Sequence, residues 1–207
     1  MKVAIVNYGM GNLGSVRRAF EDLGANPFVA GHPAALFEAQ RIVLPGVGAF
    51  PDAMARLDAD GWTEALNRLV REEKRPLLGI CLGMQLLAER GTEVKDVAGL
   101  GFVHGTIRRL DELGCRERIP HVGWNELELV VEDPLFAHIP QRSDFYFVHS
   151  YAFDAGGKQA TTGITDYGVR IVATVREGNV WGTQFHPEKS SKAGRQVLRN
   201  FLEVKSC

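Results

Sequence analysis

A chain of 207 residues, 45% of them apolar and 24% charged, has the composition of one globular domain. The formal net charge of -1 argues against general nucleic-acid binding, and no segment approaches the roughly 20 apolar residues that a membrane helix needs. The three cysteines, Cys81, Cys115 and Cys207, are widely spaced, match no metal-ligand pattern and suit a reducing, cytoplasmic environment.

The N-terminal segment, residues 1–7, is predicted to be a first strand. Residues 9–14 then match the pattern G-x-G-x-x-G, which is typical of dinucleotide-binding turns. The next predicted strand, residues 28–30, is followed by Gly31 and His32 and offers no acidic residue for a ribose. A tight strand-to-helix turn is therefore the favoured interpretation over a cofactor site.

A third strand, residues 41–44, leads into a glycine-rich loop at residues 45–50. Such a loop is either an ordinary turn or a place where backbone N–H groups approach a ligand closely. Downstream, a helix that packs on the sheet is indicated by an apolar stripe made of Trp62, Ala65, Leu66, Leu69 and Val70.

Residues 77–87 contain the most informative segment. An apolar run behind Pro76 predicts a buried strand, and helical spacing of leucines begins at Leu82, with Gly91 expected to end that helix. Cys81 stands at the joint, between Gly79 and Gly83, as the nucleophile does in a G-x-S-x-G elbow. A nucleophilic thiol is favoured over a buried structural cysteine, because the first turn of a helix stabilises a thiolate.

The second half of the chain is predicted to be rich in strands, at residues 102–107, 127–131, 145–148, 169–175 and 180–185. Residues 176–179 are expected to form a hairpin turn, and a closing helix to start at a cap formed by Ser190 and Ser191. The whole pattern predicts a single α/β domain over residues 1–207. Its central sheet is expected to be mixed but mostly parallel and flanked by helices, with an antiparallel extension.

His186, Pro187 and Glu188 follow the last predicted strand. The extended geometry before a proline places the side chains of His186 and Glu188 on roughly the same side of the chain. Glu188 could thus orient His186, and His186 could deprotonate Cys81, as in a Cys-His-acid triad. Taken alone, this short motif also fits a surface turn.

Residues 79–85 (GICLGMQ) and 186–188 (HPE) together resemble the class I glutamine amidotransferases. More narrowly, the chain resembles the glutaminase subunits of imidazole glycerol phosphate synthases at residues 8–13, 45–50, 120–125 and 186–191. These segments follow the family's order, and the resemblance spans essentially the whole chain. The glutaminases of anthranilate and pyridoxal phosphate synthases usually differ in these segments, and a catalytically silent binding module would lack a triad residue.

The resemblance implies a role for each matching residue. Cys81 attacks the side-chain amide of L-glutamine, His186 transfers protons, and Glu188 orients His186. The oxyanion is held by backbone N–H groups of Leu82 and of the loop formed by Gly46, Val47 and Gly48, while the substrate is held by Gln85, Ser150 and Tyr151.

The resemblance also implies a heterodimer without a cofactor. The partner would be a cyclase subunit with a (β/α)₈ barrel, which receives the ammonia and completes imidazole glycerol phosphate synthesis in histidine biosynthesis. The residues expected to form the docking surface for that partner are Asn12, Trp124, Tyr146 and Lys189.

Overall fold

The structure, a computed structural model, describes residues 1–156 and 160–204, so Cys207 lies outside the described residues. Its first half alternates strands with helices, as predicted. These elements are β1 (Lys2–Val6), α1 (Leu13–Glu21), β2 (Asn26–Ala30), the 3₁₀ helix η1 (Pro33–Glu38), β3 (Arg41–Gly46), α2 (Phe50–Ala59), α3 (Trp62–Leu66), the π-helical turn η2 (Asn67–Glu72), β4 (Leu77–Cys81) and α4 (Leu82–Leu86).

The second half is mainly strand. Its elements are β5 (Arg90–Gly91), β6 (Val97–Ala98), β7 (Thr106–Arg109), β8 (His121–Leu129), the 3₁₀ turn η3 (Pro134–Phe136), β9 (Ser143–His149), β10 (Tyr151–Asp154), β11 (Thr161–Asp166), β12 (Arg170–Glu177), β13 (Val180–Thr183), the 3₁₀ turn η4 (Pro187–Lys189) and the closing helix α5 (Ser191–Glu203).

Five parallel strands form the centre of the sheet, in the order β2-β1-β3-β4-β13. All five residues of β4 and all six of β3 are buried, because helices cover both faces of this parallel sheet; apart from Arg41, neither strand contains a charged residue. This order places the carboxyl ends of β3 and β4 side by side, and the chain leaves β13 next to them.

An antiparallel extension continues the sheet from β13 through β12, β10 and β7, and the hairpin of β12 and β13 turns at residues 178 and 179 as predicted. Strand β11 connects β12 to β8, which pairs with β9 as a two-stranded ribbon. The predicted fold class, a single α/β domain with a mixed sheet, is therefore confirmed.

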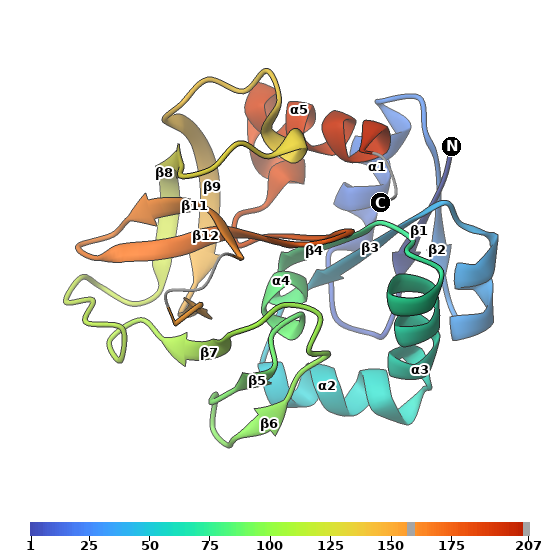
Figure 1. Ribbon diagram of the computed structural model, residues 1–207, viewed down its shortest axis with the longest axis horizontal. Helices are drawn as coiled ribbons and strands as arrows, with labels where there is room; N and C mark the ends of the chain where they lie inside the picture. Colours follow the sequence, from blue (N-terminus) through green and yellow to red (C-terminus); the bar gives the residue numbers. More distant parts are fainter. Residues whose placement is uncertain (157–159, 205–207) are drawn as a thin grey trace.

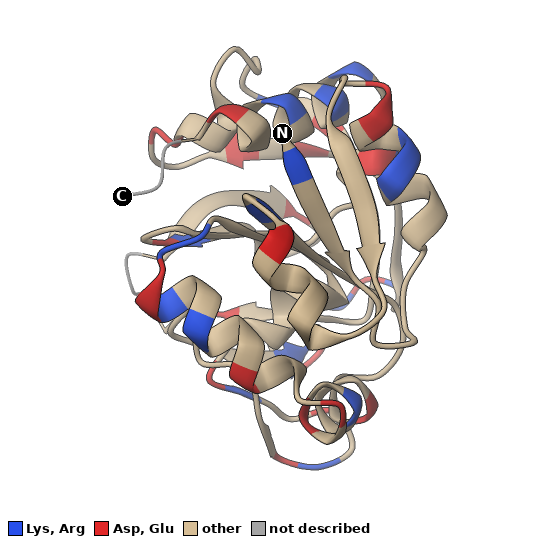
Figure 2. Ribbon diagram, turned by 90° about the vertical axis from the view of Figure 1, so that its right-hand side faces the viewer, with Lys and Arg blue, Asp and Glu red and all other residues tan. Residues whose placement is uncertain are grey.

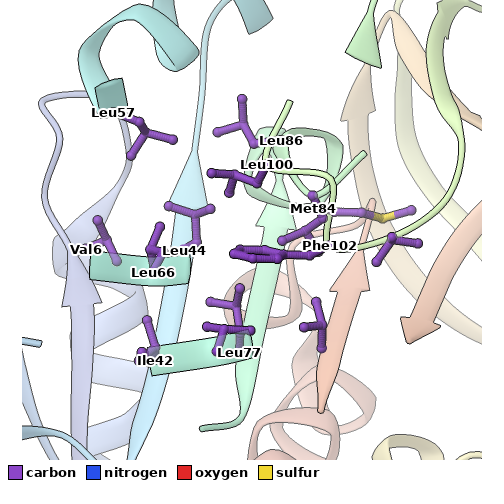
Figure 3. Close-up of a cluster of buried hydrophobic side chains, with 14 of the residues drawn as sticks. Val6, Ile42, Leu44, Leu57, Leu66, Leu77, Met84, Leu86, Leu100 and Phe102 are labelled. Atoms are coloured by element: carbon purple, nitrogen blue, oxygen red, sulfur yellow. The ribbon is translucent and has the colours of Figure 1, made fainter. Parts of the chain in front are cut away.

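Helices cover both faces of the central strands (Figure 1). On one face, α1 and α5 bury Phe20 and Phe201 against alternate residues of the strands, such as Ile5 and Trp181. On the other face, α2, α3 and α4 pack against the intervening residues (Figure 3). The stripe predicted from Trp62 to Val70 is buried in this second core, although the helix widens to a π-helical turn at Asn67.

Charged residues of both signs are scattered over the outer helices (Figure 2), in keeping with the small net charge. Within residues 1–156 and 160–204, no helix is long and apolar enough to cross a membrane.

Two local predictions were wrong. The strand predicted at residues 102–107 begins only at Thr106, and the helix after Cys81 ends at Leu86 rather than near Gly91, which lies in β5. The two errors share a cause. The backbone N–H groups of Leu100 and Val103 donate to the carbonyl groups of Leu86 and Leu87, so this loop closes the helix and cannot pair as a strand.

The cap of the last helix lies where it was predicted, since Ser190 is the N-cap residue of α5. Helix α5 does begin at Ser191, but the hydroxyl group of Ser190 makes no capping bond. Instead it donates to the carbonyl oxygen of His186 at 2.6 Å and accepts from the N–H of Tyr146 at 3.0 Å. Ser190 therefore ties the segment after β13 to β9.

Candidate active site

Cys81 is the last residue of β4, and its backbone has φ 55° and ψ -113°. Non-glycine residues rarely adopt positive φ, and such strain persists only where the surroundings enforce it. Here the flanking strands enforce it: Gly46 of β3 lies opposite Cys81, and Thr183 of β13 lies opposite Ile80. The predicted strand–turn–helix elbow is confirmed.

The two glycines around Cys81 make the turn possible. A β-carbon on Gly83 would overlap the carbonyl oxygen of Leu44, and one on Gly79 would lie 2.6 Å from the carbonyl oxygen of Gly83. Both obstacles are backbone atoms that cannot rotate away. Glycine is therefore required at both positions.

His186 follows β13 and reaches the same place as Cys81. Its Nδ1 lies 2.8 Å from Oε1 of Glu188, and both side chains are almost completely buried, with 4% and 1% of their surface exposed. The N–H of His186 donates to the carbonyl oxygen of Tyr146 at 3.0 Å. The imidazole is thus fixed by its own carboxylate and by the backbone of β9.

Burial of His186 disfavours its charged form, but Cys81 and Glu188 outweigh burial and raise the pKa of the imidazole to about 9. Nε2 of His186 is buried with no ordinary hydrogen-bond partner among the described residues, so its interaction with Cys81 is looser than a regular hydrogen bond. At neutral pH an imidazolium therefore stands beside the sulfur atom.

A cavity of about 340 Å³ opens above Cys81. Eight of the predicted site residues meet in its wall, namely Val47, Gly48, Cys81, Leu82, Gln85, Ser150, Tyr151 and His186. Glu188 lies behind His186, and Gly46 is a paired residue of β3 outside the lining. The cavity thus brings together a strained thiol, a charged imidazole and two main-chain segments, the parts needed for acyl transfer to sulfur.

The glycine-rich loop after β3 forms one edge of this cavity. Gly48 has φ 115°, a conformation that favours glycine, and the preceding Val47 is an exposed apolar residue. On the protein side the hydroxyl of Tyr8 donates to the carbonyl oxygen of Pro45 at 3.0 Å, and burial raises the pKa of that phenol. The start of the loop is therefore anchored, whereas Val47 and Gly48 face the cavity.

Gln85 links α4 to the opposite wall. Its Nε2 donates to the carbonyl oxygen of Tyr151 at 2.9 Å and to Oε1 of Gln184 at 3.1 Å. Nε2 of Gln184 in turn lies 3.9 Å from the sulfur of Cys81. Gln85 thus positions the main chain of residues 150 and 151, which the sequence analysis assigned to the substrate.

The loop between β1 and α1, which matches G-x-G-x-x-G, is a turn. The side chain of Asn12 caps α1 by accepting from the N–H of Ser15, and Arg56 donates to the carbonyl oxygen of Gly9 at 3.3 Å. Because a β-carbon on Gly9 would lie 2.5 Å from the guanidinium of Arg56, that side chain occupies the space beside the loop. The interpretation as a tight turn is confirmed.

Three of the four residues expected at a docking surface form one cluster. Trp124 and Tyr146 are directly opposite each other on β8 and β9 with ring centroids 6.1 Å apart, and Nζ of Lys189 lies 5.9 Å from the centre of the Tyr146 ring. Trp124 is 53% exposed. Asn12, at the start of α1, is the fourth residue and is also exposed.

Four residues of the cavity wall were not predicted from the sequence, namely Glu93, Pro120, Val148 and His149. His149 could have been suspected, since it ends a strand of alternating buried aromatic residues. Glu93 carries no local signal; its carboxylate accepts from the N–H of Phe50 at 2.7 Å. In residues 1–156 and 160–204, no three His, Cys, Asp or Glu side chains gather closely enough to hold a metal ion.

Comparison with known proteins gives one family for the whole chain. The family model described as "Glutamine amidotransferase class-I" matches residues 4–204. The imidazole glycerol phosphate synthase subunit HisH 1 of Campylobacter jejuni subsp. jejuni is 45% identical over 98% of this chain and 100% of its own length. The subunit HisH of Moorella thermoacetica is 45% identical over 98% of this chain and 94% of its own.

Solved structures agree at the level of the fold. The structure of PurLQS from Thermotoga maritima superposes with a TM-score of 0.78 at 18% identity, covering 98% of this chain and 97% of that one. A glutamine amidotransferase from the same organism gives 0.69 at 17% identity, covering 98% and 96%.

Proposed function

Since this chain belongs to the class I glutamine amidotransferase family, we propose that it is the glutaminase subunit of an imidazole glycerol phosphate synthase. The observation that carries the proposal is the meeting of Cys81 and His186 at one cavity, with Glu188 bound to His186 behind it. The choice of this synthase is supported by relatives that bear its name and align over nearly the full length. The whole chain, residues 1–207, acts as one domain in the cytoplasm.

In the proposed reaction, the thiolate of Cys81 attacks the carbon atom of the side-chain amide of L-glutamine. The negative charge on oxygen is held by the N–H of Leu82 and an N–H of the loop at Val47 and Gly48; each such donor is worth about 10²–10³ in rate. His186 gives its proton to the departing nitrogen, which leaves as ammonia. A γ-glutamyl thioester with Cys81 remains.

The second half of the reaction restores the enzyme. A water molecule gives a proton to His186 as it attacks the thioester carbon, and the carbon–sulfur bond breaks to release glutamate. The charge on Glu188 stabilises the imidazolium in both halves. The ammonia passes to a cyclase partner with a (β/α)₈ barrel, which docks on the cluster of Trp124, Tyr146 and Lys189 and on Asn12.

The test is steady-state glutamine hydrolysis by the chain alone, with the cyclase subunit of the same organism, and with that subunit plus an acceptor analogue. We expect slow hydrolysis alone and strong stimulation by the liganded partner. Cys81→Ala should abolish hydrolysis, while the complex still uses ammonium salts, because Cys81 serves only ammonia release. Glutamine turnover by Cys81→Ala, or full activity without a partner, would contradict the proposal.

A further inference from the structure

Two buried histidines outside the proposed triad lie next to the cavity. His121 and His149 face each other across the β8–β9 ribbon, with Nδ1 of His121 3.0 Å from Nε2 of His149, and both are almost completely buried. The ring of His121 is stacked between Phe147 and Tyr167, at centroid distances of 4.9 and 4.0 Å. The catalytic steps above use neither histidine.

The hydrogen bonds of the pair run in one direction. The carbonyl oxygen of Tyr151 lies 2.8 Å from Nδ1 of His149 and can only accept, so Nδ1 of His149 carries a proton. Burial lowers the pKa of His149 to about 3 and that of His121 to about 4, so each ring is neutral and holds one proton. Nε2 of His149 must then accept a hydrogen bond from Nδ1–H of His121.

The far end of this chain of bonds is also fixed. Nε2 of His121 is left as an acceptor, and Nδ2 of Asn125 lies 3.4 Å from it while donating to the carbonyl oxygen of Asp166 at 2.7 Å. A continuous path thus runs from β11 through β8 and β9 to the carbonyl group of Tyr151.

That carbonyl group is held from two sides, since Nε2 of Gln85 donates to it at 2.9 Å. Both lone pairs are therefore used, and the peptide of Tyr151 has one orientation. Ser150, Tyr151 and His149 all line the cavity, and the carbonyl oxygen of the preceding Val148 lies 3.7 Å from the sulfur of Cys81. A shift of this wall would move the substrate relative to the thiol.

We infer that His121 and His149 are positioning residues, which hold the main-chain wall of Ser150 and Tyr151 in register with Gln85 and Cys81 and thereby set the affinity for glutamine. The inference rests on the proposed function. Neither ring touches the reacting bond, so the pair acts on binding of the substrate more than on the chemical step.

The variant that isolates this role is His121→Phe, which keeps an aromatic ring between Phe147 and Tyr167 but removes the donor to His149. His121→Asn is the conservative variant, because its amide N–H₂ can replace the Nδ1 donor. Tyr167→Phe is the matched control. The ring of Tyr167 is stacked on His121, but the hydrogen bond that this substitution removes, from its hydroxyl group to the carbonyl oxygen of Arg118, is not part of the path from Asn125 to Tyr151.

Glutamine kinetics of each variant are measured in the complex with the cyclase subunit. His121→Phe leaves Nε2 of His149 buried without a hydrogen-bond donor, which destabilises the wall of the cavity. We therefore expect KM to rise about tenfold and kcat to change by less than about threefold. His121→Asn should recover most of the loss, and Tyr167→Phe should match the parent. An unchanged KM in His121→Phe, a loss confined to kcat, or an equal defect in His121→Asn would overturn the inference.

A measurement on the unmodified chain covers the case in which the variants do not fold. Imidazole ¹⁵N chemical shifts at pH 6 should show both rings neutral with the proton on Nδ1, and the opposite tautomer at His149 would overturn the inference. If the parent complex does not hydrolyse glutamine, the proposed function fails instead, and the kinetic comparison identifies that case separately.

Discussion

His186 and Glu188 form an ion pair that is buried on every side, which is costly unless the two charges are well matched. The pair is two residues apart, so its geometry is set locally by the turn at Pro187. The charge of the His186 imidazole, however, also depends on Cys81, which comes from another strand. The raised pKa of His186 therefore belongs to the assembled site rather than to the motif.

The first prediction compares the two members of the pair. Glu188→Gln keeps a hydrogen-bond acceptor for Nδ1 but removes the charge, whereas His186→Ala removes the proposed general base, and a general base contributes about 10²–10⁴ in rate. We expect a smaller loss of kcat in Glu188→Gln, together with a lower pKa of His186 measured by NMR. An equal or larger loss in Glu188→Gln would show that Glu188 does more than orient and charge the imidazole.

At this scale the sequence predicts residues whose signal is local. Cys81 and His186 sit in short motifs whose glycines and proline have clear backbone consequences. His121 and His149 could not be paired from the sequence, because they are 28 residues apart and meet only through the register of β8 and β9. Glu93 reaches the cavity from a short loop with no distinguishing pattern.

Among the elements, the elbow formed by β4 and α4 is the most constrained by its neighbours. The close approach of α4 to β3 at Gly83 leaves no space for a side chain, so the elbow and β3 must move together. Helix α1 is the opposite case, since nothing lies within 4 Å of a β-carbon placed on its exposed Gly14.

The second prediction uses this contrast. Gly83→Ala should destabilise the fold by about 3 kcal/mol or more, since the backbone carbonyl of Leu44 cannot give way. Gly14→Ala should be neutral or stabilising by up to ~1 kcal/mol, because alanine is the better helix former. Urea denaturation of both variants is the measurement, and equal stabilities would refute the steric argument.

The β8–β9 ribbon carries the proposed docking cluster on one face. The substitution Trp124→Ala should weaken binding of the cyclase subunit about 30-fold, as expected for an aromatic anchor at an interface. Val131, a 49% exposed apolar residue beyond the end of β8, provides the control substitution Val131→Ala. Titration calorimetry measures both, and a similar loss in the two variants would place the interface elsewhere.

The prediction of elements was wrong where a loop takes the place of a predicted strand. The segment at residues 102–107 has the composition of a strand, yet the N–H of Val103 donates to the carbonyl group of Leu87 at the end of α4. Composition alone cannot show that a neighbouring helix has unsatisfied carbonyl groups. The parallel strands were predictable because their burial on both faces leaves a continuous apolar run.

For the whole molecule, three buried histidines give stability a defined dependence on pH. His121 and His149 have pKa values below that of an unfolded histidine, about 6.5, so the unfolded state binds more protons as the pH falls from about 6.5 towards 4, and stability decreases. His186 has the opposite effect. Its raised pKa contributes stability that is fully present below about pH 6.5 and is lost as the pH rises towards 9.

We therefore expect the free energy of unfolding to be greatest near pH 6.5. Each group can change it by at most about 1.4 kcal/mol per pH unit. Urea denaturation between pH 4.5 and 9 measures the curve. His121→Phe should flatten its acid side and His186→Ala its alkaline side; a curve unaffected by both substitutions would contradict the assignment.

The sheet order has a consequence for how the chain is made. Strand β4 carries Cys81, but its second neighbour in the sheet, β13, comes near the end of the chain, and Gln184 and Cys81 are 103 residues apart in sequence. A ribosome therefore exposes the thiol long before it has synthesised His186 and Glu188. Until then β4 has an open edge and Cys81 lacks its proposed base. In the proposed mechanism, a chain truncated before His186 would hold the sulfur atom yet leave glutamine intact, so only finished molecules would hydrolyse it.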